Sequence, residues 1–180
     1  TTLLRTIAGF ISPSSGELYI DGRQMTAIPP EKRGIGMVFQ QHAIWPHMSV
    51  KDNVGYPLRQ AKVAKPEREE RISETLALVG LPGFEDRNPD GLSGGQRQRV
   101  WLALALAQDT PVLLLDEPTT FLDPAHAMSM LELARAQARA GKTVVVVLHD
   151  LMLAGHYSDS MVVMKAGEII ARGAPKQALA

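Results

Sequence analysis

The sequence has no cysteine, which excludes disulfide bonds and metal sites built on thiolates. It also has no excess charge, because nineteen basic and nineteen acidic residues cancel. Without a basic run or an aromatic RNA-binding motif, nucleic acid is a poor candidate partner. The longest apolar runs, at 100–107 and 143–148, fall far short of the roughly 18 residues that span a bilayer. No signal peptide is visible. The 180 residues suffice for one domain with a sizeable core.

Two unbroken apolar runs predict strands that are covered on both faces of a parallel sheet. They occupy residues 112–115 and 143–148, and a predicted helix over 124–140 separates them. Residues 35–39 form a third apolar run that is typical of a buried strand. Strands that alternate with helices predict an α/β fold with a mainly parallel sheet.

Between the predicted strands at 35–39 and 112–115 the pattern is mainly helical. Ser49, followed by Asp52, has the arrangement of a capping box at a helix start. We therefore expect a single domain in which residues 1–40 and 108–180 form the core and residues 41–107 form an inserted helical subdomain.

Shorter elements are predicted near both ends of the chain, and the charged residues 31–33 are expected to form a surface connection. The short elements are a helix over 3–7 that stops at Gly9, a strand over 16–20 with a turn at Asp21-Gly22, a hairpin of 161–164 and 168–171, and a last helical turn from Pro175.

The stretch 92–99, Leu-Ser-Gly-Gly-Gln-Arg-Gln-Arg, stands at the start of a segment with helical periodicity. Ser93 is a suitable N-cap, and Gly94 and Gly95 allow a ligand to approach the backbone closely. A helix N-terminus with these features is suited to an anion, above all a phosphate. By itself the stretch also fits an ordinary glycine-containing loop before an amphipathic helix.

Polar residues follow all three predicted strands of the sheet: Gln40, the pair Asp116 and Glu117, and His149. Each has a simpler explanation when it is viewed alone, as a loop hydrogen-bonding group, as solvated charges or as a structural histidine. Because ligands bind outside the carboxyl ends of parallel strands, their joint occurrence at one edge favours a ligand site there.

Together these motifs resemble those of ATP-binding cassette (ABC) ATPases. Residues 92–100 (LSGGQRQRV) resemble the signature motif, and Ser93 lies twenty-three residues before Asp116 of the Walker B-like segment 113–119 (LLLDEPT). The resemblance covers essentially the whole chain and includes the Q-loop at 38–40, the D-loop at 121–123 and the switch-histidine segment at 148–150.

The first residues resemble the last part of a Walker A motif, G-x-x-G-x-G-K-[ST]-T, with its lysine falling immediately before residue 1. By this resemblance Thr1 would supply a hydroxyl to Mg²⁺, and Thr2 would sit at the inner phosphates. The family fold is a P-loop NTPase (RecA-like) core, and its glycine loop and preceding strand are not in the sequence. We therefore expect the natural protein to begin earlier.

The resemblance implies ATP and Mg²⁺ as cofactors and assigns roles to the matching residues. Asp116 would hold Mg²⁺ through its water shell, Glu117 would polarise the attacking water, and His149 would hydrogen-bond the γ-phosphate. Gln40 would contact the metal or that water. A second group would serve the nucleotide of an opposing subunit and the dimer interface, and it consists of Ser93, Gly94, Gly95, Gln96 and Asp123.

Residues 35–40 and 45–54 resemble stand-alone ATPases of bacterial importers. The implied partners are a second ATPase subunit paired head to tail, membrane permease subunits and, indirectly, a solute-binding protein outside the membrane. Such an ATPase lies peripherally on the cytoplasmic side of the membrane. Trp45 would face the permease, or it would simply pack under its loop.

Two alternatives stay open at this point. Without the P-loop lysine, the 180 residues alone would bind ATP weakly and hydrolyse it negligibly. The second alternative is that the chain belongs to an ABC ATPase that acts on ribosomes or DNA, but its neutral net charge disfavours this hypothesis.

Overall fold

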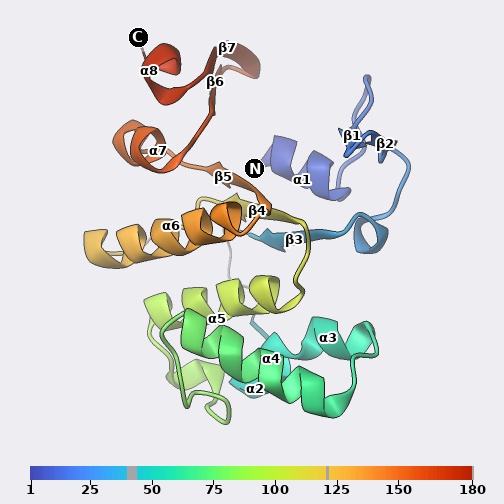
Figure 1. Cartoon of the computed structure of the whole chain (residues 1–180), viewed down its shortest axis with the longest axis vertical. Helices are drawn as coiled ribbons and strands as arrows, with labels where there is room; N and C mark the ends of the chain where they lie inside the picture. The colour runs from blue at the N-terminus through green and yellow to red at the C-terminus, as the bar shows by residue number, and fades with distance from the viewer. Residues whose placement is uncertain (40–43, 121, 180) are drawn as a thin grey trace.

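The computed structural model describes residues 1–39, 44–120 and 122–179, and a sheet of three parallel strands lies at its centre (Figure 1). The strand order is β3 (Ile35–Val38), β4 (Val112–Asp116) and β5 (Thr143–Val147). In register, β4 aligns with β3 on one side and β5 on the other, so all three strands end at the same edge. The predicted α/β fold with a parallel sheet is confirmed.

The central strand β4 is buried on both faces because helices cover both sides of the sheet. Leu115 packs in the larger core cluster with α5 (Gly94–Ala107) and α6 (Pro124–Arg139). Leu114 points into a second cluster that includes residues of α1 (Thr2–Ala8). This two-sided burial matches the unbroken apolar run of the strand.

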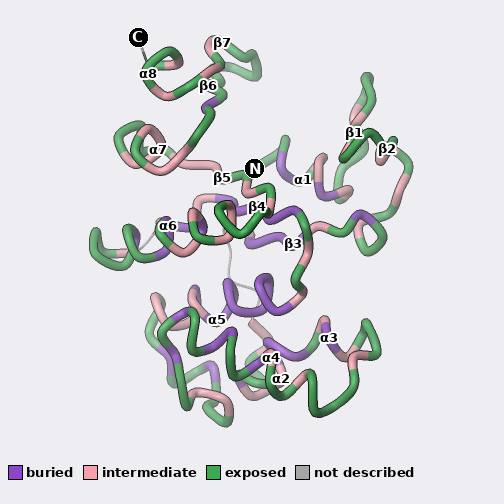
Figure 2. Tube along the Cα trace, in the orientation of Figure 1, coloured by how far each residue is buried: buried purple, intermediate pink, exposed green. Residues whose placement is uncertain are grey.

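Helix α5 lies between the sheet and the remaining helices of the segment that joins β3 to β4 (Figure 1). Residues 100–107 are all buried (Figure 2), whereas the sequence pattern predicted a single apolar face. The pattern understated the burial because α5 has neighbours on both sides. All described elements of this segment are helical, namely α2 (Val50–Val54), α3 (Tyr56–Gln60), α4 (Lys65–Leu78), the 3₁₀ helix η2 (Pro89–Gly91) and α5.

Strand β5 differs from its prediction. The apolar run predicted burial on both faces, but Thr143 is exposed and Val145 is 37% exposed. Val144 and Val146 pack against the larger core cluster. Among the described strands β5 pairs only with β4. The valines of β5 are therefore buried only where they pack against α6 and β4.

The segment 31–33 was predicted to be a charged surface connection, and this is wrong for Arg33. The Arg33 side chain is 6% exposed and donates hydrogen bonds of 2.7–3.3 Å to four backbone carbonyls, including those of Thr6 and Ile7 at the end of α1. Gly9 ends that helix at φ 93°, and a Cβ there would lie 2.6 Å from Arg33 Nε. The helix stop therefore needs glycine both for its backbone and for the space that Arg33 fills.

Two α-helices were not predicted, namely α7 and, in the helical segment described above, α3. The other elements near the ends of the chain follow the sequence pattern. The first strand is shorter than expected, and no described helix is long and apolar enough to cross a membrane. These elements are β1 (Tyr19–Ile20), β2 (Arg23–Gln24), the 3₁₀ helix η1 (Pro30–Lys32), α7 (Leu151–Tyr157), the hairpin β6 (Met161–Lys165) and β7 (Glu168–Gly173), and α8 (Pro175–Ala178).

Candidate functional site

The carboxyl edge of the sheet gathers four of the predicted residues, which we call the strand-edge cluster: Thr1, Asp116, Glu117 and His149. Asp116 closes β4 and is 1% exposed. Its Oδ1 accepts a hydrogen bond of 3.3 Å from the Thr1 hydroxyl at the start of α1. The packing of α1 beside β4 thus brings together residues that are 115 positions apart in the sequence.

The other oxygen of Asp116, Oδ2, is buried and has no hydrogen-bond partner in the described part of the chain. A buried carboxylate oxygen without a partner is costly. A divalent cation or its water shell would satisfy it, and Mg²⁺ prefers oxygen ligands of this type. The residues present therefore fit a magnesium ion at this edge, with the Thr1 hydroxyl and Asp116 as its protein groups.

Glu117 leaves β4 with an unusual backbone conformation. Its φ is 51°, a region that is sparsely populated by residues other than glycine and that often marks functional sites. The Glu117 N–H still bonds to the Val147 carbonyl on β5, at 3.1 Å. The side chain is 11% exposed, and its Oε2 accepts a bond of 3.3 Å from the Thr120 hydroxyl. The turn thus directs a largely buried carboxylate toward the sheet edge.

His149 follows β5 and meets this carboxylate, since its Nε2 lies 2.7 Å from Glu117 Oε1. The His149 side chain is 79% exposed. It therefore offers most of its surface to a ligand while one ring nitrogen is held by Glu117. Gln40, which was also predicted at this edge, lies outside the described residues, as does Phe121 of the D-loop-like segment.

The Ser93 turn, residues 93–96, forms the start of α5 as the sequence predicted. Ser93 Oγ accepts a hydrogen bond of 3.2 Å from the Gln96 N–H, and Gln96 Oε1 accepts one of 3.0 Å from the Ser93 N–H. This reciprocal capping box fixes the turn with local bonds alone. Gly94 is exposed, and a Cβ placed on it would meet nothing within 4 Å.

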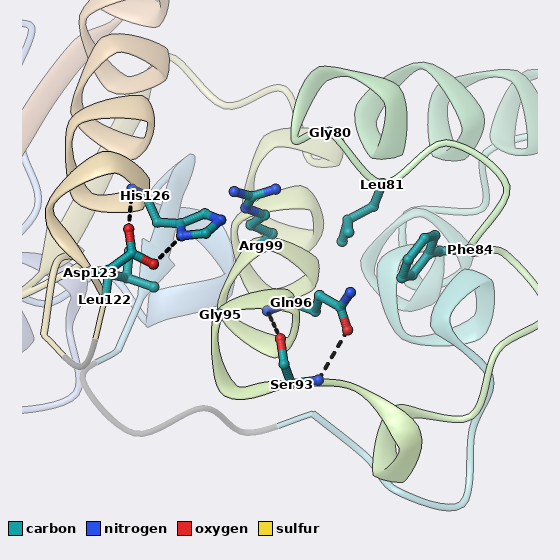
Figure 3. Close-up of a pocket in the computed structure, with 10 residues that line it drawn as sticks. All are labelled: Gly80, Leu81, Phe84, Ser93, Gly95, Gln96, Arg99, Leu122, Asp123 and His126. Carbon is teal, nitrogen blue, oxygen red and sulfur yellow. Dashed lines mark hydrogen bonds and ion pairs between the residues drawn. The ribbon is translucent and has the colours of Figure 1, made fainter.

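The Ser93 turn borders a pocket of about 370 Å³ between α5, the segment after α4 and the start of α6 (Figure 3). Arg99 and His126 supply its basic groups, while Leu81 and Phe84 form an apolar wall. Asp116, Glu117 and His149 are not among its lining residues. One chain therefore carries two separate groups of predicted residues. The described lining residues are Gly80, Leu81, Phe84, Ser93, Gly95, Gln96, Arg99, Leu122, Asp123 and His126.

Asp123 is the N-cap of α6 and lies on the rim of this pocket. Its Oδ1 accepts a bond of 3.0 Å from the His126 N–H, and its Oδ2 contacts His126 Nδ1. The side-chain hydrogen bond from His126, followed by the backbone bond, lowers the pKa of Asp123. The carboxylate therefore stays ionised, and its position is set by the first turn of α6.

The loop that carries Trp45 is held by Asn53, which is completely buried. Asn53 Oδ1 accepts a bond of 2.8 Å from the Trp45 N–H, and Nδ2 donates to the carbonyls of Trp45, Met48 and Ser49. The Trp45 ring lies 4.6 Å from that of Tyr56, centroid to centroid. The Trp45 ring thus packs against Tyr56 while its side chain stays partly exposed, and both predictions for Trp45 stay open.

Sequence reasoning missed three side chains that hold these groups in place. Thr120 binds Glu117, Asn53 anchors the Trp45 loop, and the buried Gln98 donates from α5 to the Pro118 carbonyl. Gln98 stands between Arg97 and Arg99, before the apolar run at 100–107, so the sequence offered no signal that it is buried. The other two lie in segments where polar residues are common, so nothing in the sequence distinguished them.

A family model described as "ABC transporter" matches residues 1–120. Among curated proteins, the chain is 47% identical over 178 residues to the Fe(3+) ions import ATP-binding protein FbpC of Pasteurella multocida. It is 46% identical to the spermidine/putrescine import ATP-binding protein PotA of Acidothermus cellulolyticus, and 43% identical over 176 residues to the maltose/maltodextrin import ATP-binding protein MalK of Yersinia pestis. These alignments cover 97–98% of the chain but 46–51% of the relatives, so the chain spans about half their length.

Among solved structures, the chain resembles an ATP-binding cassette described as the dimeric structure of a post-hydrolysis state bound to ADP and Pi. The TM-score is 0.87 at 34% identity, and the match covers 97% of this chain and 79% of that one. A second dimeric structure, described as a bacterial ABC transporter cassette, matches equally well.

Proposed function

The chain belongs to the ABC transporter family, and from this premise we propose that it is the ATP-binding and ATP-hydrolysing part of a subunit that powers solute import across a membrane. The observation that carries the proposal is the strand-edge cluster. It combines a buried, unpartnered carboxylate oxygen of Asp116 with the paired side chains of Glu117 and His149. These are the groups that metal-assisted phosphoryl transfer to water requires at one place.

Within this proposal, Thr1 and Asp116 would hold Mg²⁺, and Thr2 would lie at the inner phosphates of ATP. The bound metal would neutralise charge on the phosphates. Glu117 would accept a hydrogen bond from the attacking water and orient it, and its strained turn would keep the carboxylate at the sheet edge. His149 would donate a hydrogen bond to the terminal phosphate from its exposed side. Gln40, which lies outside the described residues, remains part of the proposed set.

The Ser93 turn would serve a second nucleotide, held by another copy of the chain. Its pocket does not include the strand-edge cluster, so one chain offers two surfaces rather than one closed site. Ser93, Gly94, Gly95 and Gln96 would contact the terminal phosphate, which suits a helix N-terminus. Asp123 on the pocket rim would lie at the interface. A head-to-tail pair would then complete two sites, and the dimeric state of the structural relatives supports it.

Import is the shared activity in the names of the curated relatives, whereas their cargoes are ferric ions, polyamines and maltose. We therefore extend import, but no particular cargo, to this chain. Permease subunits would bind at the anchored Trp45 loop, within a helical subdomain of residues 41–107. A solute-binding protein would act indirectly through them. The ATPase would lie peripherally on the cytoplasmic side of the membrane.

The test is ATP hydrolysis by the protein expressed from its complete reading frame, together with its permease subunits. Replacing Glu117 by Gln keeps the shape of the side chain but removes its basicity, and hydrolysis should fall by about 10²–10⁴-fold. The matched control is Glu132→Gln on the exposed side of α6, which should hydrolyse ATP like the wild type. Equal turnover by Glu117→Gln and wild type would refute the proposal. That residues 1–180 alone hydrolyse ATP negligibly stays a separate prediction.

A further inference from the structure

Gln98 is a buried polar side chain in the first half of α5, between the partly exposed Arg97 and Arg99. It lies on α5, is 4% exposed, and is followed by the fully buried segment 100–107. Its Nε2 donates a hydrogen bond to the backbone carbonyl of Pro118, twenty positions away. A buried amide is costly unless it is paired, so the side chain is held where this one carbonyl can receive it.

The partner of Gln98 is adjacent to Glu117. Pro118 follows Glu117 directly, at the point where the backbone turns away from β4 with φ 51° at Glu117. The same turn is closed by the bond of 3.2 Å from the Thr120 N–H to the Glu117 carbonyl, and the Thr120 hydroxyl binds the Glu117 side chain. A displacement of the Pro118 carbonyl would therefore alter the direction of the Glu117 carboxylate.

The other end of the connection is the Ser93 turn. Gln98 lies five positions after Ser93 on the same continuous helix, which moves as a rigid unit over so short a length. Leu122 also lies near the start of α5, because a Cβ placed on Gly95 would meet Leu122 Cδ2 at 3.5 Å. Figure 3 shows Gly95 and Leu122 on neighbouring elements at the pocket. Pro118 is thus bonded to α5, and Leu122 lies beside the same helix.

We propose that Gln98 is a positioning residue that couples Glu117, in the nucleotide site of its own chain, to the Ser93 turn that the chain lends to a second copy. The inference rests on the proposed function. Because the amide bond spans the gap between β4 and α5 and Leu122 lies beside α5, the orientation of Glu117 depends on where α5 lies. A nucleotide that engages the Ser93 turn thereby sets the geometry of the general base in the other site.

The test is Gln98→Met in the complete protein with its permease subunits. Methionine has a similar length and suits the apolar surroundings but cannot donate to Pro118. We expect kcat to fall by about tenfold or more, as small misplacements of a reacting group do, with KM for ATP within about twofold of wild type. The matched control is Gln108→Met, which removes a similar amide-to-carbonyl bond of 3.3 Å, to Leu104, at the far end of the same helix. It should leave kcat unchanged.

A double-mutant cycle distinguishes coupling from a merely structural role. In a Ser93→Ala background, Gln98→Met should cost much less in kcat than it does in the wild type, whereas Gln108→Met should be additive with Ser93→Ala. Leu122→Ala, at a half-buried position that packs against the larger core cluster, tests the neighbourhood of Leu122 and α5 and is compared at equal melting temperature. It should lower kcat in the same direction by a smaller factor.

Provided that the wild-type protein hydrolyses ATP, two outcomes would overturn the inference alone. One is that Gln98→Met and Gln108→Met have the same kcat. The other is that the effects of Gln98→Met and Ser93→Ala on kcat are strictly additive. A wild-type protein that does not hydrolyse ATP would instead overturn the proposed function on which the inference rests. Thermal unfolding of all variants is measured alongside, and equal melting temperatures for Gln98→Met and Gln108→Met with unequal kcat would support coupling.

Discussion

The Ser93 turn and the strand-edge cluster are assembled in opposite ways. The Ser93 turn is held by two hydrogen bonds between Ser93 and Gln96, three positions apart. The strand-edge cluster joins Thr1 to Asp116 across 115 positions and Glu117 to His149 across 32. One surface is therefore formed by its local sequence, whereas the other exists only when β4 and β5 pair in register and α1 packs beside β4.

The two surfaces also differ in how well their polar groups are satisfied. The capping box pairs the polar groups of the Ser93 turn within the turn itself. In the strand-edge cluster, Asp116 Oδ2 is buried without a partner among the described residues, and Glu117 has a strained backbone. The Ser93 turn is therefore stabilised by its own hydrogen bonds, whereas the strand-edge cluster keeps a buried oxygen and a strained backbone at a cost in stability.

The largest effect in this comparison is expected at His149. His149→Ala removes the exposed ring that contacts Glu117, and we expect kcat for ATP hydrolysis to fall by about 10²-fold, in the range of acid–base and positioning groups. His156→Ala, which removes an exposed histidine from α7, is the matched control and should hydrolyse ATP normally. Steady-state kinetics on the complete protein decide the matter, and equal rates for the two variants would remove His149 from the cluster.

Asp116→Asn should separate stability from activity. The substitution removes the charge of a buried carboxylate whose Oδ2 has no partner among the described residues, so the melting temperature without Mg²⁺ and ATP should rise. Affinity for Mg²⁺ in the presence of ATP should fall by about 10–100-fold, the usual cost of losing a group that holds a metal through its ligands. Calorimetry and a Mg²⁺ titration of hydrolysis measure the two effects. A lower melting temperature of the metal-free variant would contradict the prediction that the Asp116 charge destabilises the metal-free protein.

Ser93→Ala tests the locally formed surface. Loss of the cap should reduce the free energy of unfolding by about 1 kcal/mol, within the usual range for an N-cap serine. Ser129→Ala, which deletes a hydroxyl bonded to the Ala125 carbonyl inside α6, is the control and should change stability by less than about 0.5 kcal/mol. Urea unfolding compares the pair. If Ser129→Ala proved as destabilising as Ser93→Ala, the capping box would contribute nothing particular.

The smallest effect concerns acid stability at the pocket rim. The pKa of Asp123 is lowered mainly by the His126 side chain, so its contribution to stability is present above the unfolded value of about 4 and is lost as the pH falls through the folded value. His126→Leu removes that bond but keeps the backbone bond. The variant should therefore be slightly less stable than the wild type near pH 7, and this difference should shrink as the pH falls through the folded pKa of Asp123, where the wild type loses the contribution as well. Equal stability of the two proteins near pH 7 would argue against the pair.

Much of the fold could be predicted because its signals are local or periodic. The unbroken apolar run before Asp116 predicted a strand that is buried on both faces, and β4 is such a strand. The serine and glycines before α5 predicted its start, and the capping box is there. The α/β fold and the membership of the ABC family are confirmed. The division into a core and a helical subdomain stays a prediction, as do the roles of the site residues.

The failures share a physical cause, since they depend on what covers a residue. The valine run of β5 has the same pattern as β4 but is partly exposed, because only β4 pairs with it among the described strands. Arg33 stands in a charged segment but is buried, because the end of α1 offers it carbonyls. Helix α7 was missed although Asp150 caps it with two bonds, because its seven residues are too few for a clear periodic pattern.

Local signals in the sequence predicted the helix start at Ser93, the strand that ends at Asp116 and the strand that precedes His149. Only the tertiary structure decided that Glu117 and His149 meet at 2.7 Å, that Asp116 keeps a buried oxygen without a described partner, and that Gln98 reaches the Pro118 carbonyl. The physical reason is the distance along the sequence over which each interaction acts. A cap and an apolar run act over a few residues, whereas burial and strand-edge contacts depend on segments that the chain brings together from far apart.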